Sequence, residues 1–125
     1  MKLSDCYNVV DFRKLAKQKL PSPIFHYIDG GADDEVTLRR NTEAFEKCDL
    51  IPSVLTDVSN VNLSTTVLGQ KIKFPLFLSP TAMHQMYHPD GEVAAAKAAE
   101  KLGTFFSLST MATTSIEDVS KVSDG

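Results

Sequence analysis

Hydroxyl-bearing residues follow two short apolar segments of the sequence. Thr81 comes after Phe74–Leu78, and Ser109 and Thr110 come after Thr104–Leu108. Apolar runs of this length are typical of strands buried in a parallel sheet, and the carboxyl ends of parallel strands meet at one edge. That edge is where α/β proteins bind polar ligands, although hydroxyls also serve ordinary turns. The pattern therefore leaves two interpretations open, a ligand site over the strand ends or turn chemistry.

Other residues could also carry chemistry, and each has a structural interpretation beside the functional one. Tyr27 precedes the pair Gly30–Gly31 and could contact a ligand, but a core tyrosine beside a helix stop is the plainer interpretation. His84 and His88 have the spacing of a metal-binding pair, yet a proline follows and no glutamate accompanies them. Asp33–Glu35 could bind a cation, but three acids suit a helix start better. The sequence therefore predicts no metal site.

The elements around the hydroxyls are predicted to alternate between strand and helix. Asp90–Glu92 opens an alanine-rich helical run after the first apolar segment, and Gly103 suits its left-handed C-terminal cap. The second apolar segment follows, and either Thr114 or Ser115 begins another helix with a capping-box pattern. This order predicts a βαβα unit with parallel strands.

The preceding part of the chain is predicted to be helical. Asn8 caps a first helix that Pro21 ends, Ser22–Pro23 starts a second, and Asp33–Glu35 opens a third. We expect the third helix to turn its apolar residues inward. They are Val36, Leu38, Phe45 and Cys48.

A connection and a hairpin separate the helices from the βαβα unit. Asp49–Asn60 is proline-punctuated and irregular, whereas Leu63–Lys73 alternates about Gly69–Gln70 as a hairpin does. We therefore expect a helical segment with its connection over 1–62, and a hairpin with the first two βα units over 63–125. Because a complete eight-stranded barrel needs roughly 200 residues or more, we expect this chain to be the amino-terminal piece of a larger α/β protein.

Composition excludes several classes of function. The chain is 42% apolar and 23% charged, with a net charge of −3, and it has no basic run, so nucleic acid is not an expected partner. Its amino terminus lacks the apolar core of a signal peptide, and no apolar stretch approaches the ~20 residues that span a bilayer. Cys6 and Cys48 show no metal-like spacing and are typical of free thiols in a reducing compartment, which favours the cytoplasm.

Several motifs in order resemble one known family. They are Tyr27–Ala32, Asp57–Ser59, Thr66–Gly69, Pro80–Met83, His88–Glu92 and Leu108–Thr110. Their order and spacing, over practically the whole chain, are similar to those of the FMN-dependent 2-hydroxy acid dehydrogenases and oxidases. Glycolate oxidase, flavocytochrome L-lactate dehydrogenase and mandelate dehydrogenase belong to this family.

The resemblance implies a fold, a cofactor and a set of binding residues. The fold is the amino-terminal portion of a (β/α)8 TIM barrel, with a helical segment before it and a β-hairpin at the barrel floor. Pro80, Thr81 and Ala82 would contact FMN near the reactive edge of the ring, and Ser109 would hydrogen-bond it. Tyr27 matches the tyrosine whose hydroxyl binds the substrate carboxylate in the family.

The resemblance also implies that the catalytic machinery is incomplete within this chain. Family members use a histidine as general base, an arginine on the substrate carboxylate and a lysine near the reduced flavin. All of these would lie beyond Gly125, and none of His26, His84 and His88 matches the base by position. We therefore assign no catalytic residue here and expect the chain alone to be inactive.

The pocket residues favour L-lactate as the substrate. Met111 stands where glycolate-oxidising relatives commonly have tryptophan, so a flexible thioether leaves room for a substrate methyl. Phe25–Ala32 resembles bacterial L-lactate dehydrogenases, whereas His88–Glu92 is shared more with the oxidases, and His84 replaces a common glutamine. Glycolate or another 2-hydroxy acid is the alternative substrate.

The family resemblance leaves the partners and the rival functions open. Electrons would pass to a quinone, a cytochrome or oxygen, and the full-length protein would form a homotetramer. It would be cytoplasmic, with respiratory relatives held peripherally on the inner membrane. A truncated, non-catalytic interaction module and a related FMN-dependent isopentenyl diphosphate isomerase are the other hypotheses, and Tyr27 argues against the latter.

Overall fold

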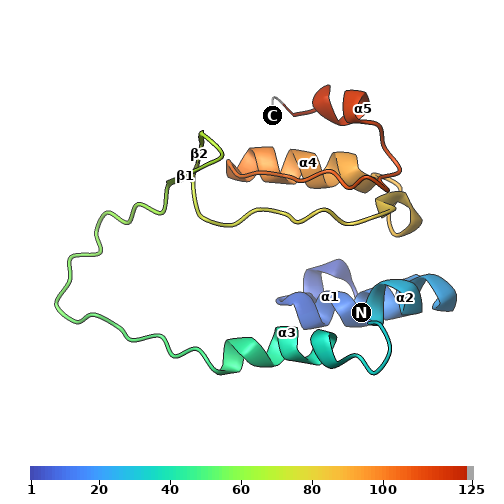
Figure 1. The fold of residues 1–125 in the computed structure, drawn as a ribbon, viewed down its shortest axis with the longest axis horizontal. Coiled ribbons are helices and arrows are strands. Elements are labelled where there is room, and N and C mark those ends of the chain that lie inside the picture. Colours follow the sequence, from blue (N-terminus) through green and yellow to red (C-terminus); the bar gives the residue numbers. More distant parts are fainter. Residues whose placement is uncertain (124–125) are drawn as a thin grey trace. The chain divides into compact units, whose positions relative to one another are not determined.

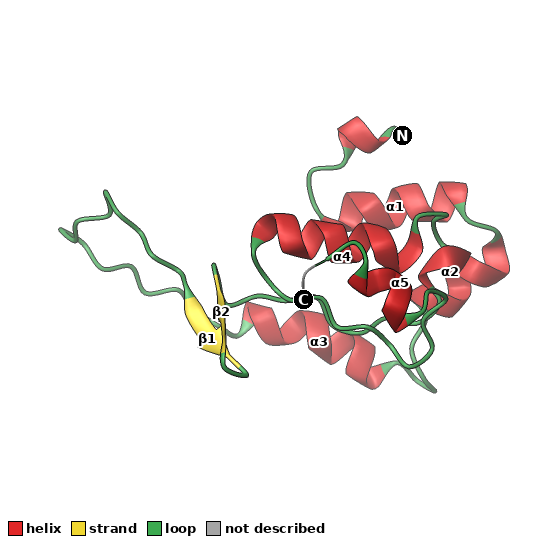
Figure 2. Ribbon diagram, turned by 90° about the horizontal axis from the view of Figure 1, so that it is seen from above, coloured by secondary structure: helices red, strands yellow, loops and turns green. Residues whose placement is uncertain are grey.

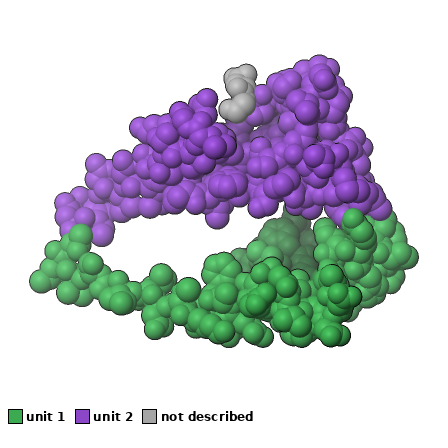
Figure 3. Space-filling view, in the orientation of Figure 1, with its two compact units in different colours: residues 1–56 green, residues 57–125 purple. Residues whose placement is uncertain are grey.

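The computed structural model describes residues 1–123 and divides the chain into two compact units. Unit 1 comprises residues 1–56 and unit 2 comprises residues 57–125, and Figure 3 colours them separately. The predicted boundary after residue 62 falls inside unit 2. No helix within residues 1–123 combines the length and the hydropathy that crossing a membrane requires.

Unit 1 is helical, as the sequence predicts. Its elements are a 3-10 turn η1 (Leu3–Asp5) and the helices α1 (Val9–Lys19), α2 (Ser22–Asp29) and α3 (Val36–Glu46) (Figure 1). The Asn8 cap is confirmed, because its Oδ1 accepts a hydrogen bond of 2.9 Å from the backbone N–H of Asp11. Pro21, not Ser22, occupies the cap position of α2, and Ser22 is already helical. The proline at the second helical position still suits a helix start, since an N–H there has no intrahelical partner.

The contact between α1 and α2 holds the centre of unit 1. Phe25 of α2 is buried, and the Arg13 guanidinium makes a two-pronged ion pair with Asp29, at 2.5 Å (Nε–Oδ1) and 2.9 Å (Nη2–Oδ2). The hydrogen bond from the Arg13 guanidinium, together with its charge, lowers the pKa of the Asp29 carboxyl. This pair fixes the end of α2 against α1, two residues beyond Tyr27.

The inward face predicted for α3 is wrong for this structure. Each of the four apolar residues chosen for that face is exposed, with Phe45 at 81% of its full accessible surface. The reason is that α3 has no extensive contact with another element of the described chain, so nothing covers that face. The helix start is close to the predicted one, with Glu35 in the left-handed conformation just before Val36.

Unit 2 opens with the predicted hairpin, one residue out of register at its turn. Strands β1 (Thr65–Val67) and β2 (Gln70–Ile72) pair antiparallel, and the turn residues are Leu68 and Gly69, with φ of 50° and 80°. Gln70 therefore belongs to the ladder opposite Val67 and not to the turn. Two positive φ angles are typical of the turn whose twist matches that of the paired strands.

The two segments predicted as parallel strands lie side by side but form little regular strand. They share one parallel bridge, Leu78 with Phe106, and Figure 2 draws the rest as loop (Figure 2). Leu78 N–H donates to the carbonyl of Phe105 at 3.0 Å, and Ser107 N–H donates to the carbonyl of Leu78 at 3.1 Å. The parallel direction is thus confirmed, but each segment has a neighbour on one edge only within the described chain, which limits the ladder.

Helix α4 (Gly91–Leu102) connects these segments, and α5 (Ile116–Ser120) follows them, so the predicted βαβα order is confirmed. Gly103 closes α4 in the left-handed conformation, as predicted, with φ of 70°. Of the two possible starts for α5, the Ser115 one forms, because its Oγ accepts a hydrogen bond of 3.1 Å from Asp118 N–H. The core of unit 2 consists of Ile72, Ala96 and Ala99.

Candidate functional site

Two loops follow the paired segments at the end of unit 2 where α4 begins. The first strand-end loop is Ser79–Met83 and the second is Ser109–Thr113 (Figure 1). Met83 N–H donates a hydrogen bond of 3.1 Å to the carbonyl of Met111, so the backbones of the two loops are directly joined. The structure therefore brings together the two hydroxyl-bearing segments that the sequence places at strand ends.

The first strand-end loop presents unused backbone groups. Within residues 1–123, the N–H groups of Ser79, Thr81 and Ala82 make no hydrogen bond, and Pro80 has no N–H to offer. Thr81 is exposed and Ala82 half-buried. Backbone polar groups that the protein leaves without partners beside half-buried surface are available to a ligand. The loop can thus donate hydrogen bonds to the edge of a polar molecule.

Ser109 is oriented by its own loop. Its Oγ accepts a hydrogen bond of 3.1 Å from Met111 N–H, and its carbonyl accepts one of 3.0 Å from Ala112 N–H. A hydroxyl has one proton to donate in addition to its acceptor sites, so the Ser109 hydroxyl proton is left for another partner. Ser109 therefore combines a turn role with a free donor, and the two interpretations of the sequence pattern are compatible.

Glu92, in the first turn of α4, is the main feature that sequence reasoning missed. It is fully buried and is the only buried charged side chain within residues 1–123. Its carboxylate accepts hydrogen bonds from the backbone N–H of His84 (3.1 Å) and of Thr113 (2.8 Å). The hydroxyls of Thr113 and Thr114 also donate to it, at 2.7 and 2.8 Å. The sequence signals were an acid in the first turn of an alanine-rich helix and two adjacent threonines.

The charge of Glu92 is stabilised by these donors. Burial alone would raise the pKa of the carboxyl, but the hydrogen bonds from Thr113 and Thr114 outweigh it and lower the pKa from 4.5 to about 2. The site therefore contains an ionised, fully buried carboxylate at neutral pH. The positive end of α4 also favours a negative charge at this position.

The predicted substrate-binding residues lie in different units. Met111 is in the second strand-end loop and is 58% exposed, beside the backbone bond that joins the loops. Tyr27 is in α2 of unit 1 and is 59% exposed. Their roles toward a substrate stay predictions.

The histidines take structural positions. His84 begins the 3-10 turn η2 (His84–Met86), and its ring lies 6.1 Å from that of Phe106. The Nδ1 of His88 accepts a hydrogen bond of 3.2 Å from Asp90 N–H. No group of three or more metal-ligating side chains gathers within residues 1–123.

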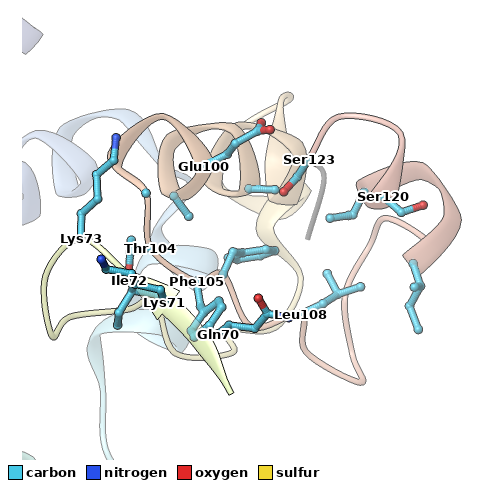
Figure 4. Close-up of a pocket in the computed structure, with 16 residues that line it drawn as sticks. Gln70, Lys71, Ile72, Lys73, Glu100, Thr104, Phe105, Leu108, Ser120 and Ser123 are labelled. Carbon is cyan, nitrogen blue, oxygen red and sulfur yellow. The ribbon is translucent and has the colours of Figure 1, made fainter. Parts of the chain in front are cut away.

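A cavity of about 760 Å³ lies in unit 2 away from the strand-end loops (Figure 4). Strand β2, the inner face of α4 and α5 line it, with Phe105 and Leu108 from the second apolar segment. This lining is the mainly apolar layer between helices and strands, and none of the predicted site residues is part of it.

The comparisons with known proteins identify the family. Residues 16–125 match the sequence profile of the family described as FMN-dependent dehydrogenase. This chain belongs to that family. The resemblance seen in the motifs is confirmed, and FMN is confirmed as the cofactor.

The curated relatives of this family member are much longer than the chain. It is 46% identical to glycolate oxidase 1 of Oryza sativa subsp. indica over 123 residues, which cover 98% of this chain and 33% of that protein. It is 44% identical to the glycolate oxidase of Spinacia oleracea over 118 residues, which cover 94% of this chain and 32% of that protein. The chain thus spans about a third of the length of these relatives.

Solved structures confirm the predicted fold class. An active chimera of (S)-mandelate dehydrogenase matches with a TM-score of 0.89 and 41% identity, over 95% of this chain and 34% of that one. A soluble mutant of the membrane-associated (S)-mandelate dehydrogenase from Pseudomonas putida matches with a TM-score of 0.88 and 40% identity, with the same coverage of both chains. A mandelate oxidase mutant with a C4a-OH-FMN adduct matches with a TM-score of 0.85 and 31% identity, over 90% of this chain and 34% of that one. These are TIM-barrel flavoenzymes, and this chain has the α/β fold of their amino-terminal portion.

The strand-end loops fit the cofactor of the family. The flavin ring system presents nitrogen and oxygen acceptors along one edge, and such acceptors need N–H or O–H donors. Within residues 1–123, the N–H groups of Thr81 and Ala82 and the hydroxyl of Ser109 donate to no protein group. The donor set at this edge therefore suits FMN.

Proposed function

We propose that this chain forms the flavin-binding edge of an enzyme that oxidises an L-2-hydroxy acid with FMN. The observation that carries the proposal is the pair of hydrogen-bonded strand-end loops, which leave donors free at one edge in a member of an FMN-dependent family. Ligands of α/β proteins bind at this edge because loop backbone there is free to bond them. Related proteins named glycolate oxidase and mandelate dehydrogenase support a 2-hydroxy acid as the substrate class.

The residues of the loops have distinct roles in this proposal. Ala82 N–H and Thr81 donate to the flavin edge, Pro80 keeps the loop rigid, and the Ser109 hydroxyl donates from the second loop. When bound, FMN supplies the hydride acceptor, and the protein supplies orientation and charge. Tyr27 donates its phenolic hydrogen to the substrate carboxylate.

The acid–base chemistry belongs to residues outside this chain. The general base, the carboxylate-binding arginine and the lysine near the flavin lie beyond Gly125 in our proposal, so no catalytic residue is assigned among residues 1–123. The three histidines of this chain have positions that do not match the base.

We further propose L-lactate as the preferred acid. Met111 is exposed in the second strand-end loop, and its flexible side chain adapts to a substrate methyl group. The proteins compared above carry the names of glycolate and mandelate enzymes, so the size of the substrate side chain is the property to measure.

Steady-state oxidation by the full-length protein tests the substrate. We expect kcat/KM to be highest for L-lactate, lower for glycolate and (S)-mandelate, and negligible for D-lactate, the stereochemical control. One side-chain carbon in a pocket is worth about tenfold or more. A higher kcat/KM for glycolate or (S)-mandelate would refute the lactate assignment and leave the reaction class standing.

The acceptor, the assembly and the location belong to the same proposal. Electrons leave the flavin for a quinone, a cytochrome or oxygen, and the full-length protein is a cytoplasmic homotetramer that can bind the inner membrane peripherally. Reoxidation rates with each acceptor, and the partition of the protein between membrane and supernatant at low and high salt, test these points.

A further inference from the structure

Glu92 links the two strand-end loops to α4 through a closed set of hydrogen bonds. The Oε1 atom of its carboxylate accepts hydrogen bonds from His84 N–H, which directly follows the first strand-end loop, and from the N–H of Thr113, the last residue of the second. The Oε2 atom accepts hydrogen bonds from the hydroxyls of Thr113 and its neighbour Thr114. Both loops are thus tied to one buried charge at the start of a helix.

The Thr113 hydroxyl extends this link into a bridge between the loops. Its Oγ1 accepts a hydrogen bond of 3.2 Å from Gln85 N–H and donates one of 2.7 Å to Glu92 Oε2. The hydrogen bond of 3.1 Å from Met83 N–H to the carbonyl of Met111 makes a second bridge between the loops. The spacing between the loops is therefore set by these bridges rather than by the length of regular strand, which is limited to one bridge pair.

The hydrogen-bond donors around Glu92 match a carboxylate better than an amide. Four donor groups converge on the side chain of Glu92, and a carboxylate has about four acceptor sites and no proton of its own. A glutamine amide of nearly the same shape would point its NH₂ group at some of these donors. At least one bridge would then be lost, and the loop that depended on it would be free to move.

We infer that Glu92 is a positioning residue for the cofactor, which sets the separation of the Thr81–Ala82 and Ser109 donors through Thr113 and Thr114. This inference rests on the proposed function, because it concerns the same flavin edge. Glu92 is buried away from solvent and does not touch the flavin in this account. Its effect is on how well the donors of the two loops converge on one ring.

The experiment compares variants of the full-length FMN-loaded protein. Thr113→Val removes the hydroxyl bridge at almost constant volume, Thr113→Ser retains the hydroxyl, and Glu92→Gln replaces the carboxylate. Glu43→Gln on the exposed face of α3 is the matched control. The readouts are the FMN dissociation constant, the visible spectrum of the bound flavin and its reduction potential. A role limited to overall stability would lower the melting temperature without moving the spectrum or the potential.

We expect Glu92→Gln and Thr113→Val to weaken FMN binding about tenfold, because each loses a hydrogen bond to a charged group. Both should also shift the flavin spectrum and potential. Thr113→Ser should restore binding to within about twofold of the unmodified protein, as should Glu43→Gln. If Glu92→Gln does not fold, the Thr113 pair decides the question alone.

Two results would overturn the inference. One is FMN affinity and potential within about twofold of the unmodified protein in Thr113→Val and in any folded Glu92→Gln. The other is an equal loss in Thr113→Val and Thr113→Ser, which would show that keeping the hydroxyl does not preserve FMN binding. An unmodified protein that binds no FMN would refute the proposed function as well, so the two failures are distinguishable.

Discussion

At the scale of single residues, Glu92 couples stability to pH. Its folded-state pKa of about 2 lies below the ordinary value of 4.5, so ionisation of the carboxyl is more favourable in the folded state than in the unfolded state. The stabilisation is complete above about pH 4.5 and is lost as pH falls from there toward 2. This stabilisation is at most about 3 kcal/mol, because each unit of pKa difference between the two states is worth about 1.4 kcal/mol.

This coupling predicts a pH-dependent difference between the unmodified protein and Glu92→Gln. Urea unfolding of the full-length protein should give a free-energy difference of up to about 3 kcal/mol at about pH 7, shrinking steadily below about pH 4.5. Because other carboxyls titrate in both proteins, the difference between them isolates Glu92. A difference that stays constant from about pH 7 to about pH 3 would show that the Glu92 charge does not contribute.

Met111 gives a second residue-scale prediction, on substrate choice. Met111→Trp fills the space that we assign to the substrate methyl, so kcat/KM for L-lactate should fall by about tenfold or more relative to that for glycolate. Met111→Leu, of similar volume, should change the ratio little. An unchanged lactate-to-glycolate ratio in Met111→Trp would place Met111 outside the pocket.

Part of the candidate site could be predicted from the sequence. Thr81 and Ser109 were selected because strand ends in parallel sheets converge, which is a general property of the fold. Glu92 was missed because an acid in the first turn of a helix normally faces solvent, and only the threonines from a distant loop bury it here. The partner of a buried charge depends on tertiary contacts that spacing does not encode.

Among the elements, η2 and the start of α4 approach each other closely at Gly91. Gly91 is buried with φ of 46°, and a Cβ there would lie 2.6 Å from Gln85 Cγ. Gly69, in the hairpin turn, also has a positive φ of 80° but has open space around it. Alanine substitutions at Gly69 and Gly91 therefore distinguish the cost of backbone strain alone from the cost of strain with steric overlap.

We expect Gly69→Ala to cost about 1 kcal/mol of unfolding free energy, from backbone strain alone. Gly91→Ala should cost about 3 kcal/mol, because displacement of Gln85 adds to the strain. It should also weaken FMN binding, since Gln85 N–H bonds Thr113. Thermal unfolding of the two variants of the full-length protein measures this, and equal costs would show that the Gln85 contact is readily relieved.

Local signals predicted the elements better than long-range ones did. The Asn8 and Ser115 caps and the Gly103 stop were found from the sequence because each depends on neighbours within a few residues. The inward face of α3 was not, because apolar spacing shows a face without showing what covers it. The parallel segments lie between these cases, with direction predicted and extent overestimated.

At the scale of the whole molecule, the described chain buries few large apolar side chains. Leu50, Ile51 and Leu55 are each more than 90% exposed, and the buried apolar residues within residues 1–123 are Phe25, Ile72, Ala96 and Ala99. Such a surface is typical of a chain that packs against further protein. It also keeps open the interaction-module hypothesis, in which the chain acts without flavin.

We therefore expect the 125-residue chain, produced alone, to bind the dye ANS strongly and to unfold without a sharp thermal transition. Near-UV circular dichroism and calorimetry would measure this. A cooperative transition with little ANS binding and a defined oligomer would instead favour the interaction module.

We propose that this chain contributes the flavin edge of a 2-hydroxy acid-oxidising enzyme, and anaerobic reduction of the flavin by substrate is the decisive test. The full-length protein should be yellow as purified and lose its visible flavin absorbance when L-lactate is added without oxygen. Colour should return when an acceptor is admitted. A protein that carries FMN but stays yellow with L-lactate, glycolate and (S)-mandelate alike would contradict the account.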